Sequence, residues 1–425
     1  MINRKNSFWK LFSLSSLVVL VKTIMAFAVN KFLAFTLGPS IFASVAQFQN
    51  LLSVGQGFSS LSLQNGWVSL TSRYKNTDEL PGIWRGGVRL TIFGNCFLIL
   101  LGIVFLFVAP LETLFPEIPK RFVQVAILFA LPGIFASNIT TICLSVLNGL
   151  EKYKRFAFLS VATSFLQGLW VILFLYFHVF SLLSVIATQS LLSAFIATAL
   201  VKKFGLSLKA LKEPRAFNKE NRVIWFSFIL MGFIPMILTP LALIAIRQGI
   251  SVTLSPESAG IWQGVMRISD FFTLAFSSVL GVILLPKFSV DSTREEFWKM
   301  FRPLLFKIFL FALFSTSLCF VFREFLVEFL LSKAFLKASD LLPYQLLGDF
   351  FKAFGFSFGL ILIACKETKK FICSEIIFQI FLVGATFVLL PKMGLFAPVV
   401  SYAIENILYA LTTFILVCKI QWKSL

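Results

Sequence analysis

Oppositely charged residues stand three positions apart in two long apolar stretches of the sequence. Arg267 and Asp270 lie within GIWQGVMRISDFFTLAFSSVLGVILLP at 260–286, and Asp349 and Lys352 lie within LLPYQLLGDFFKAFG. Residues three apart share one face of a helix, so each pair can form an ion pair. A charge at the centre of a membrane helix costs roughly 2.5–3.5 kcal/mol on insertion scales. Either each pair neutralises itself between packed helices, or it places a charge in a shared cavity.

The composition indicates that these stretches are membrane helices. Hydrophobic residues make up 58% of the 425 residues and charged residues only 13%, which is too little polar surface to cover a soluble globule. We therefore predict an all-α, polytopic membrane protein with about 12 transmembrane helices, one for each apolar run of about 20 residues. The runs lie at 11–36, 41–70, 86–109, 122–147, 157–177, 182–201, 223–246, 260–286, 303–322, 341–364, 372–390 and 395–418.

The longest cytoplasmic gap between runs divides the predicted helices into two sets of six. It covers residues 202–222 and is rich in lysine. We predict an N-terminal lobe at 1–201, a cytoplasmic linker at 202–222 and a C-terminal lobe at 223–425. Duplicated bundles of this kind are common in transporters, which bind substrate between the repeats. The two lobes are expected to surround a central cavity.

Basic residues set the predicted orientation. With both termini inside, 26 of the 38 lysines and arginines fall in cytoplasmic segments, and seven, including Arg247, fall in outer segments. Cytoplasmic loops of membrane proteins carry such an excess of positive charge. The formal net charge of +19 therefore reflects topology, and we expect no nucleic-acid partner.

Five basic residues remain within the predicted spans. Lys31 and Lys307 lie near helix ends, where a long side chain reaches the interface, and this reading is favoured for both. Lys22 lies close to the midplane of its helix, where such an escape is hardest, so a cavity position is favoured. Arg267 and Lys352 complete the set.

An uncharged polar stripe runs along the second predicted helix. Its steps of four, three, four and four residues keep the side chains on one helical face. Hydrogen bonding between helices is one explanation, and lining a hydrated path for a hydroxyl-rich substrate fits better. Gln345, one turn before Asp349, is a further polar candidate for the cavity. The stripe consists of Gln49, Ser53, Gln56, Ser60 and Gln64.

Carboxylates are confined to the second half of the predicted membrane region. The first six runs contain none, whereas Asp270, Asp349, Glu375 and Glu405 lie within or near later runs. A site for an organic cation needs buried carboxylates, while a basic interior suits an anion such as a phosphate group. The six cysteines are expected to be free thiols, and no catalytic residue, metal site or cofactor is expected.

Several fragments together resemble a known family, the bacterial lipid III and O-antigen flippases. These form the polysaccharide transporter family of the multidrug/oligosaccharidyl-lipid/polysaccharide exporter superfamily. The combination of GIWQG followed by ISD with a later QLLGD and a lysine is specific. The matching fragments are LVK at 20–22, Lys31, Gly38-Pro39, Asn65-Gly66, GIWQGVMRISD at 260–270, LLP at 284–286, LLS at 330–332, Asp340, QLLGDFFK at 345–352, Glu375 and Gln379.

This resemblance implies a transporter and not an enzyme. Members move an undecaprenyl-diphosphate-linked oligosaccharide across the bacterial cytoplasmic (inner) membrane. The glycan serves surface polysaccharide biosynthesis, such as O-antigen of lipopolysaccharide, lipooligosaccharide or enterobacterial common antigen. Expected partners are the lipid-linked oligosaccharide, membrane lipids, a polysaccharide polymerase and a chain-length regulator. Residues at matching motif positions are Lys22, Lys31, Arg267, Asp270, Asp349 and Lys352.

The resemblance also assigns roles within the expected cavity. Basic residues would bind the diphosphate and acidic sugars, and one position departs from the pattern: the family carries a basic residue in its second helix where this chain has Gln49. Coupling to a proton or sodium gradient is a further hypothesis. Its candidate titrating groups are Asp270, Asp349 and Glu375.

Two alternatives stay open at this point. A multidrug or cation exporter of the same superfamily is disfavoured by the carboxylate-free first half. A membrane glycosyltransferase or polymerase usually needs a large extramembrane loop with catalytic groups, and the longest loop here is the lysine-rich segment 202–222.

Overall fold

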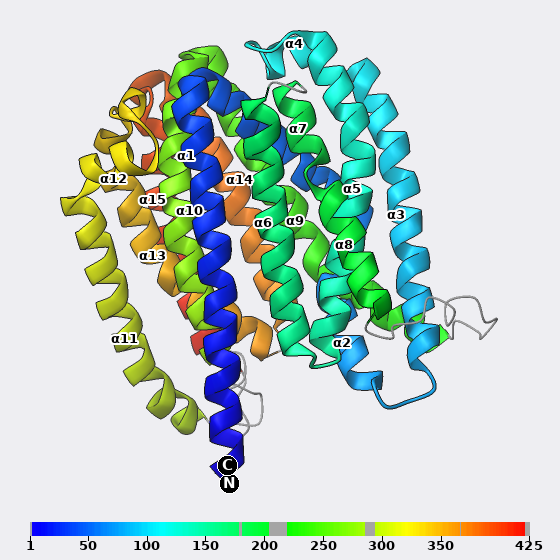
Figure 1. Cartoon of the computed structure of the whole chain (residues 1–425). Helices are drawn as coiled ribbons and strands as arrows, with labels where there is room; N and C mark the ends of the chain where they lie inside the picture. The colour runs from blue at the N-terminus through cyan, green and yellow to red at the C-terminus, as the bar shows by residue number, and fades with distance from the viewer. Residues whose placement is uncertain (1, 178–180, 204–218, 285–293, 366, 421–425) are drawn as a thin grey trace. The chain divides into compact units, whose positions relative to one another are not determined.

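The computed structural model describes residues 2–177, 181–203, 219–284, 294–365 and 367–420, which are almost entirely helical (Figure 1). No strand occurs in these ranges, so the all-α prediction is confirmed for them. Residues 204–218 of the predicted linker lie outside the described residues.

The first half contains α1 (Ile2–Ser60), α2 (Gln64–Tyr74), α3 (Leu80–Val108), α4 (Leu111–Leu114), α5 (Lys120–Gly149), α6 (Tyr153–Tyr176), α7 (Leu182–Thr188) and α8 (Ser190–Lys203). The second half contains α9 (Lys219–Thr253), α10 (Pro256–Leu284), α11 (Arg294–Val321), α12 (Arg323–Leu330), a 3-10 turn (Lys333–Phe335), α13 (Ala338–Ala364), α14 (Thr368–Met393) and α15 (Phe396–Cys418).

Ten helical segments in the described ranges are long and apolar enough to cross a membrane. Nine of them match one predicted run each, and Val18–Tyr74 covers the first run from residue 18 onward and the whole of the second. The eighth run corresponds to α10, which is not one of the ten. A polytopic membrane protein is thus confirmed, whereas the count of 12 spans stays a prediction.

A backbone break at Gly38 separates the first two predicted spans. Gly38 has φ 69° and ψ 175°, a conformation that glycine adopts without steric cost. The next residue, Pro39, lacks the N–H group that a continuous helix would need. The chain therefore leaves one helix and enters the next without a loop.

A second break divides the run predicted at 41–70. Leu61 and Ser62 have positive φ angles of 49° and 53°, so α1 ends at Ser60 and α2 begins at Gln64. Non-glycine residues rarely adopt this conformation, and the helical register is lost there. The polar stripe is consequently split between two helices.

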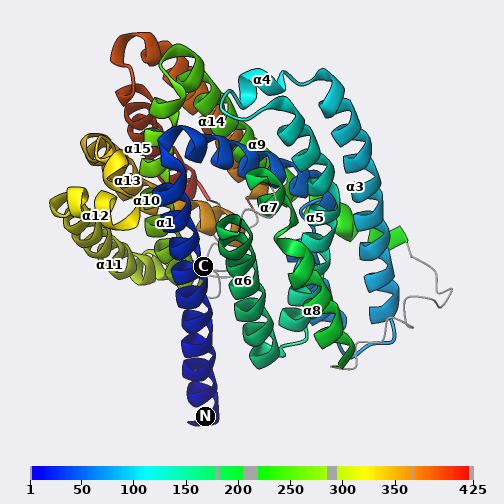
Figure 2. The same ribbon diagram turned by 45° about the horizontal axis from the view of Figure 1, so that its top comes forward.

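The described helices form two compact units. Unit 1 comprises Met1–Phe32 and Gln47–Leu241, and unit 2 comprises Leu33–Ala46 and Ala242–Leu425, so α1 and α9 contribute to both. Within unit 1, α5 lies beside α7 and α8 (Figure 2). Within unit 2, α15 packs along α13 and α14.

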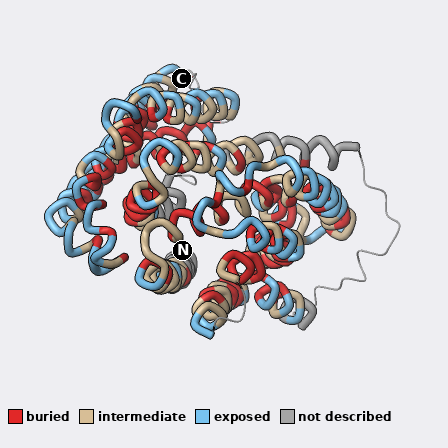
Figure 3. Tube along the Cα trace, turned by 90° about the horizontal axis from the view of Figure 1, so that it is seen from above, coloured by how far each residue is buried: buried red, intermediate tan, exposed pale blue. Residues whose placement is uncertain are grey.

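The outward surfaces of both units are strongly apolar. Phe93 and Phe107 on α3 are 66% and 86% exposed, and Phe314 on α11 is 67% exposed. Along each helix, buried and exposed residues alternate, so most helices have one buried side and one exposed side (Figure 3). Large exposed side chains of this kind are typical of helices surrounded by lipid.

Candidate functional site

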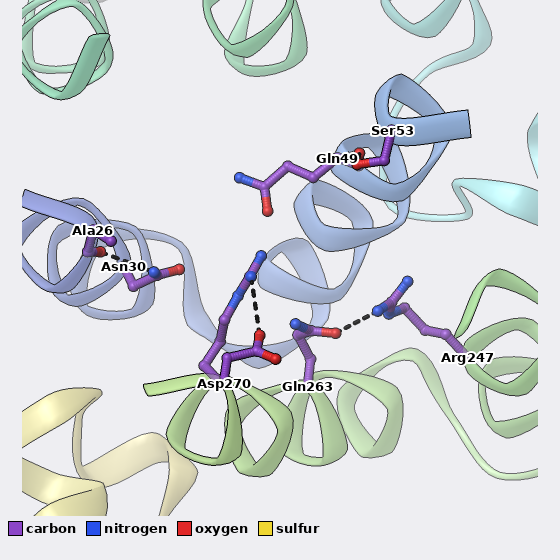
Figure 4. A network of polar contacts seen from close by, with 8 residues as sticks. Ala26, Asn30, Gln49, Ser53, Arg247, Gln263 and Asp270 are labelled. Carbon is purple, nitrogen blue, oxygen red and sulfur yellow. Dashed lines mark hydrogen bonds and ion pairs between the residues drawn. The ribbon is translucent and has the colours of Figure 1, made fainter. Parts of the chain in front are cut away.

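One face of α10 carries Gln263, Arg267 and Asp270 at helical spacing. The Nη1 atom of Arg267 lies 3.5 Å from Oδ2 of Asp270, which confirms the ion pair expected from the spacing (Figure 4). The Arg267 side chain is 22% exposed and that of Asp270 is 58% exposed. An exposed charge facing lipid is costly, so the exposure of this pair favours hydrated surroundings for this face.

Arg247 lies buried in a membrane helix, and its assignment to an outer segment was wrong. It belongs to the apolar segment Gly232–Thr253 of α9 and is 3% exposed. Its Nη2 group donates a hydrogen bond to Oε1 of Gln263 (Figure 4), and its guanidinium carbon lies 5.6 Å from the centroid of the Trp262 ring. The error arose because the helix continues past residue 246, where the predicted run ended. Arg247 of α9 therefore adds a second guanidinium to the polar face of α10 that carries Arg267.

Asp349 occupies the centre of a buried hydrogen-bond network between α10, α13 and α15. Ser269 Oγ donates to Asp349 Oδ1 at 2.6 Å, and the Tyr402 hydroxyl donates to the same oxygen at 2.8 Å. The amide of Gln345 donates to Ser269 Oγ at 3.1 Å. Asp349 is only 1% exposed, so these donors replace the water that a carboxylate otherwise requires. The sequence-predicted residues Gln345 and Asp349 are thereby brought together.

Two glycines on α13 allow α15 to approach closely enough to build this network. A Cβ atom added at Gly348 would lie 2.4 Å from Cδ1 of Tyr402, and one at Gly355 would lie 2.5 Å from Cδ1 of Tyr409. Both the glycines and the tyrosines are seven residues apart, so the two contacts repeat after two helical turns. The glycine spacing thus fixes where both hydroxyl groups lie.

The second tyrosine and the neighbouring part of α15 hold two further carboxylates. The Tyr409 hydroxyl donates to Oε1 of Glu375 at 2.5 Å. Glu405 is 7% exposed and accepts a hydrogen bond from the amide of Asn406 at 2.6 Å. The sequence placed Glu405 near a span without giving it a role. In the structure it belongs with the buried polar groups of unit 2.

Lys352 does not form the ion pair with Asp349 that its spacing suggested. No salt bridge joins the two within the described ranges. Instead, Lys352 Nζ lies 5.5 Å from the ring centroid of Tyr402. The ammonium therefore meets the ring of the same tyrosine whose hydroxyl binds Asp349. This second charged pair is organised through α15 and not along its own helix.

Lys22 and Lys31 both lie on the first part of α1 and are partly exposed. Nine residues correspond to two and a half helical turns, so the two side chains leave opposite sides of the helix. Next to Lys31, the amide of Asn30 donates to the carbonyl of Ala26 at 2.8 Å (Figure 4). The two lysines therefore do not form one basic patch on α1.

A pocket of about 270 Å³ lies within unit 1, among α1, α5, α6, α7 and α8. The polar stripe contributes Gln49, Ser53 and Gln56 to its wall. Ser60 and Gln64 do not line it, because the break at residues 61–63 places Gln64 on α2, where it is exposed. The other polar lining residues are Ser137, Gln167, Gln189 and Ser190.

Small residues bring the walls of this pocket together. A Cβ atom at Gly133 of α5 would lie 1.9 Å from the carbonyl oxygen of Ala187, so only glycine fits against α7. The Ser190 hydroxyl donates to the Gly133 carbonyl at 2.5 Å. Gly55 of α1 lets that helix approach the next lining residue of α5, Ile134. These contacts place side chains from distant parts of the sequence around one space.

Comparison with known proteins gives relatives that span nearly the whole chain, although no family model matches it. The lipid III flippases of Escherichia coli (strain K12) and Shigella flexneri are each 26% identical over 396 residues, covering 92% of this chain and 93% of theirs. The chain resembles the lipid III flippases. The resemblance noted in the sequence motifs is therefore confirmed over most of the chain.

Solved structures show a shared fold. The inward closed conformation of the lipid II flippase MurJ matches with a TM-score of 0.73 at 18% identity, covering 96% of this chain and 87% of that one. An inward-facing multidrug resistance MATE transporter of the MOP superfamily matches with a TM-score of 0.70 at 14% identity, covering 93% and 94%. The fold is thus one of polytopic transporters.

Sequence reasoning missed Arg247, Gln167 and Gln189. Arg247 stood at a predicted helix end, where a basic residue needs no further explanation. Gln167 and Gln189 are single amides in apolar runs and lack the regular spacing that revealed the stripe. Only the folding of α6 and α8 beside α5 brings them to the pocket.

Proposed function

We propose that this protein is a flippase that moves an undecaprenyl-diphosphate-linked oligosaccharide across the bacterial inner membrane. The observation that carries the proposal is the open charged face of α10, in a chain whose relatives are lipid III flippases. A hydrated basic group inside a membrane protein suits a diphosphate headgroup. The prenyl chain stays in lipid while the headgroup passes through the protein, which supports surface polysaccharide assembly.

Basic residues bind the diphosphate in this proposal. Arg267 presents a planar guanidinium that can contact two phosphate oxygens, and Lys22, Lys31 and Lys352 supply single ammonium groups. Lys352 is the most constrained of these, because its ammonium lies at the ring of Tyr402. Polar side chains such as Gln49, Gln56, Gln64 and Gln345 bind sugar hydroxyls in the same proposal.

Transport by alternating access fits a chain with two compact units. We keep the proposed division into lobes at 1–201 and 223–425 with a cytoplasmic linker at 202–222. Each lobe would move largely as a body about a central cavity. Because α1 and α9 each contribute residues to both compact units, we propose that these two helices bend during such a motion.

Reconstitution of the purified protein in liposomes tests the proposed function. The probe is undecaprenyl diphosphate carrying a short oligosaccharide, and a membrane-impermeant glycosidase reports which leaflet holds it. Liposomes with the protein should expose the inner-leaflet probe within minutes, while protein-free liposomes should not. Absence of translocation by well-folded protein would refute the proposal, provided that an active lipid flippase works in the same assay.

Coupling to a proton or sodium gradient is part of the proposal. Asp270, Asp349 and Glu375 remain its candidate groups, and Glu405 joins them as a buried carboxylate of the same unit. A gradient should drive accumulation of the probe in one leaflet. If collapsing both gradients leaves the final distribution unchanged, transport is passive equilibration.

Both termini lie in the cytoplasm in the proposed topology, as the distribution of basic residues favours. Cys373 near the start of α14 is exposed and gives a native test, because Lys369 and Lys370 precede it. A membrane-impermeant maleimide should label it in inside-out vesicles and not in intact spheroplasts. Labelling from the outer side would reverse the topology. Cys373→Ser is the matched control.

A polysaccharide polymerase and a chain-length regulator are proposed partners, because they act on the translocated oligosaccharide. Crosslinking in membranes, followed by identification of the captured proteins, tests this part. If neither a polymerase nor a chain-length regulator is crosslinked in cells that are assembling polysaccharide, both are removed from the proposal.

A multidrug or cation exporter is the second candidate, because MATE transporters share the fold. The carboxylates Asp349, Glu375 and Glu405 in unit 2 are the groups that such a cargo would need. Uptake of ethidium into inside-out vesicles separates the two candidates. Gradient-driven ethidium uptake without translocation of the lipid probe would favour the exporter.

A further inference from the structure

The pocket within unit 1 is polar and yet carries no charge. Its lining includes four glutamines, Gln49, Gln56, Gln167 and Gln189, together with serines, and none of its lining residues is acidic or basic. A polar cavity in a membrane protein is costly unless its groups are hydrogen-bonded or hydrated. So many amides around one space therefore indicate a ligand that both donates and accepts hydrogen bonds.

Internal hydrogen bonds orient these side chains without using up their capacity. Gln56 donates to Ser137 Oγ at 2.9 Å, and Gln167 donates to Ser193 Oγ at 3.0 Å. A glutamine amide has two N–H donors and a carbonyl acceptor, so each retains groups for a ligand. A sugar hydroxyl needs a donor and an acceptor together, which an amide supplies and a carboxylate or an ammonium does not.

The remaining wall suits the other surfaces of a sugar ring. Leu52, Ile134 and Ile186 supply apolar contact for its C–H groups. Gln189 lies at the junction between α7 and α8, where its backbone keeps right-handed helical angles of φ −53° and ψ −25°. The volume of about 270 Å³ is at the lower end of small-molecule sites, which suits one sugar residue and not a whole glycan.

We propose that this pocket binds an uncharged sugar residue of the transported headgroup, such as a hexose or an N-acetylhexosamine, and selects against acidic sugars. The inference rests on the proposed flippase function and adds a specificity site to it. An acidic sugar would have to shed water in a space that offers no cation, which is strongly unfavourable. The pocket thereby distinguishes sugars, while the diphosphate is recognised elsewhere.

Binding to three lipid probes tests this assignment. The probes are undecaprenyl diphosphate without sugar, with a neutral trisaccharide of hexose and N-acetylhexosamine, and with the same trisaccharide bearing one hexuronic acid. Trp170 offers an intrinsic fluorescent reporter, because its indole N–H donates to Thr188 at 3.3 Å, next to the lining residues Ala187 and Gln189. Wild-type protein should bind the neutral probe at least tenfold more tightly than the acidic one.

Amide-to-thioether variants measure the contribution of the pocket. Gln56→Met and Gln167→Met keep side-chain length but remove hydrogen bonding. Each should weaken binding of the neutral probe by about tenfold and leave the sugar-free probe unchanged. Gln124→Met, on α5 and outside the lining, is the matched control and should change neither. Size-exclusion profiles and thermal unfolding verify that the variants are folded.

A charge-introducing variant gives a second, independent measurement. Gln189→Glu keeps the shape of the side chain and should weaken binding of the acidic probe further, since two carboxylates would then meet. If the wild type binds no probe and translocates none, the proposed function fails and this inference fails with it. If the wild type translocates the neutral probe but the methionine variants bind it normally, only the pocket assignment is overturned. Equal wild-type affinity for neutral and acidic probes also overturns it.

Discussion

The interiors of the two units differ in the kind of polar group they hold. Unit 1 buries amides and hydroxyls, both in the pocket and in a cluster where Ser59 binds Asn95 and Asn138, and its one buried charged residue in the described ranges is Arg85. Unit 2 contains charged groups, with Asp349 and Glu405 buried among membrane helices. Within the described residues, buried carboxylates are therefore confined to unit 2, while the pocket of unit 1 is lined by uncharged groups alone.

The two kinds of interior are also built differently. In unit 2, tyrosines fitted against glycines direct their hydroxyls at carboxylates, and one oxygen of Asp349 receives two donors. In the pocket of unit 1, Gln167 donates to the Ser193 hydroxyl, which itself donates to the Ser190 carbonyl. A buried carboxylate is costly without its donors, whereas an amide beside water is not. Changes in unit 2 should therefore affect folding and energy coupling, and changes in the pocket should affect ligand choice.

Arg267→Ala should cause the largest loss of transport. The variant removes the basic group on the open face of α10, which in our proposal contacts a phosphate through a charge-assisted hydrogen bond. A 100-fold loss in rate corresponds to about 2.8 kcal/mol of activation free energy. Translocation in liposomes should fall about 100-fold for every diphosphate lipid, whatever its sugar. Arg121→Ala, an exposed arginine at the start of α5, is the control. Normal transport by a folded Arg267→Ala protein would limit the arginine to neutralising Asp270.

Asp349→Asn should separate transport from its driving force. Asparagine still accepts the hydrogen bonds from Ser269 and Tyr402 through its carbonyl, so the network persists without its charge. The variant should equilibrate the lipid probe between leaflets but fail to accumulate it under a proton or sodium gradient. The measurement is the leaflet distribution with and without each gradient. Accumulation equal to that of the wild type would exclude Asp349 as the coupling group.

Sequence patterns predicted the elements well because apolar run length is a direct signal of membrane helices. Nine runs match single helical segments, and the Arg267–Asp270 pair follows from helical spacing alone. The break at Leu61–Ser62 was not predictable, because no glycine or proline marks it. The polar stripe consequently appeared longer than it is.

Contacts between helices were the part that sequence could not supply. Lys352 and Asp349 have the same spacing as the pair on α10, yet Tyr402 from α15 separates their roles. That outcome depends on Gly348 meeting Tyr402 across two helices. The spacing of two residues along α13 does not reveal which side chain of α15 lies beside them.

Tyr402→Phe should lower stability more than any single change in the pocket. The ring still packs against Gly348, but Asp349 loses one of its two donors in a site that is 1% exposed. A hydrogen bond to a charged group contributes about 1.5–3 kcal/mol, so the free energy of unfolding should fall by about that amount. Thermal or denaturant unfolding in detergent measures it. A loss below about 0.5 kcal/mol would mean that the tyrosine hydroxyl does not stabilise the carboxylate.

Gln167→Met should have the smallest effect on stability and so completes the contrast between the units. Its partner Ser193 still donates to the Ser190 carbonyl at 2.8 Å, so no buried group is left without a hydrogen bond by this change. The free energy of unfolding should shift by less than about 0.5 kcal/mol, as for most changes that leave no polar group stranded. A fall as large as that of Tyr402→Phe, measured under the same conditions, would make the pocket a structural core and remove the distinction drawn between the two interiors.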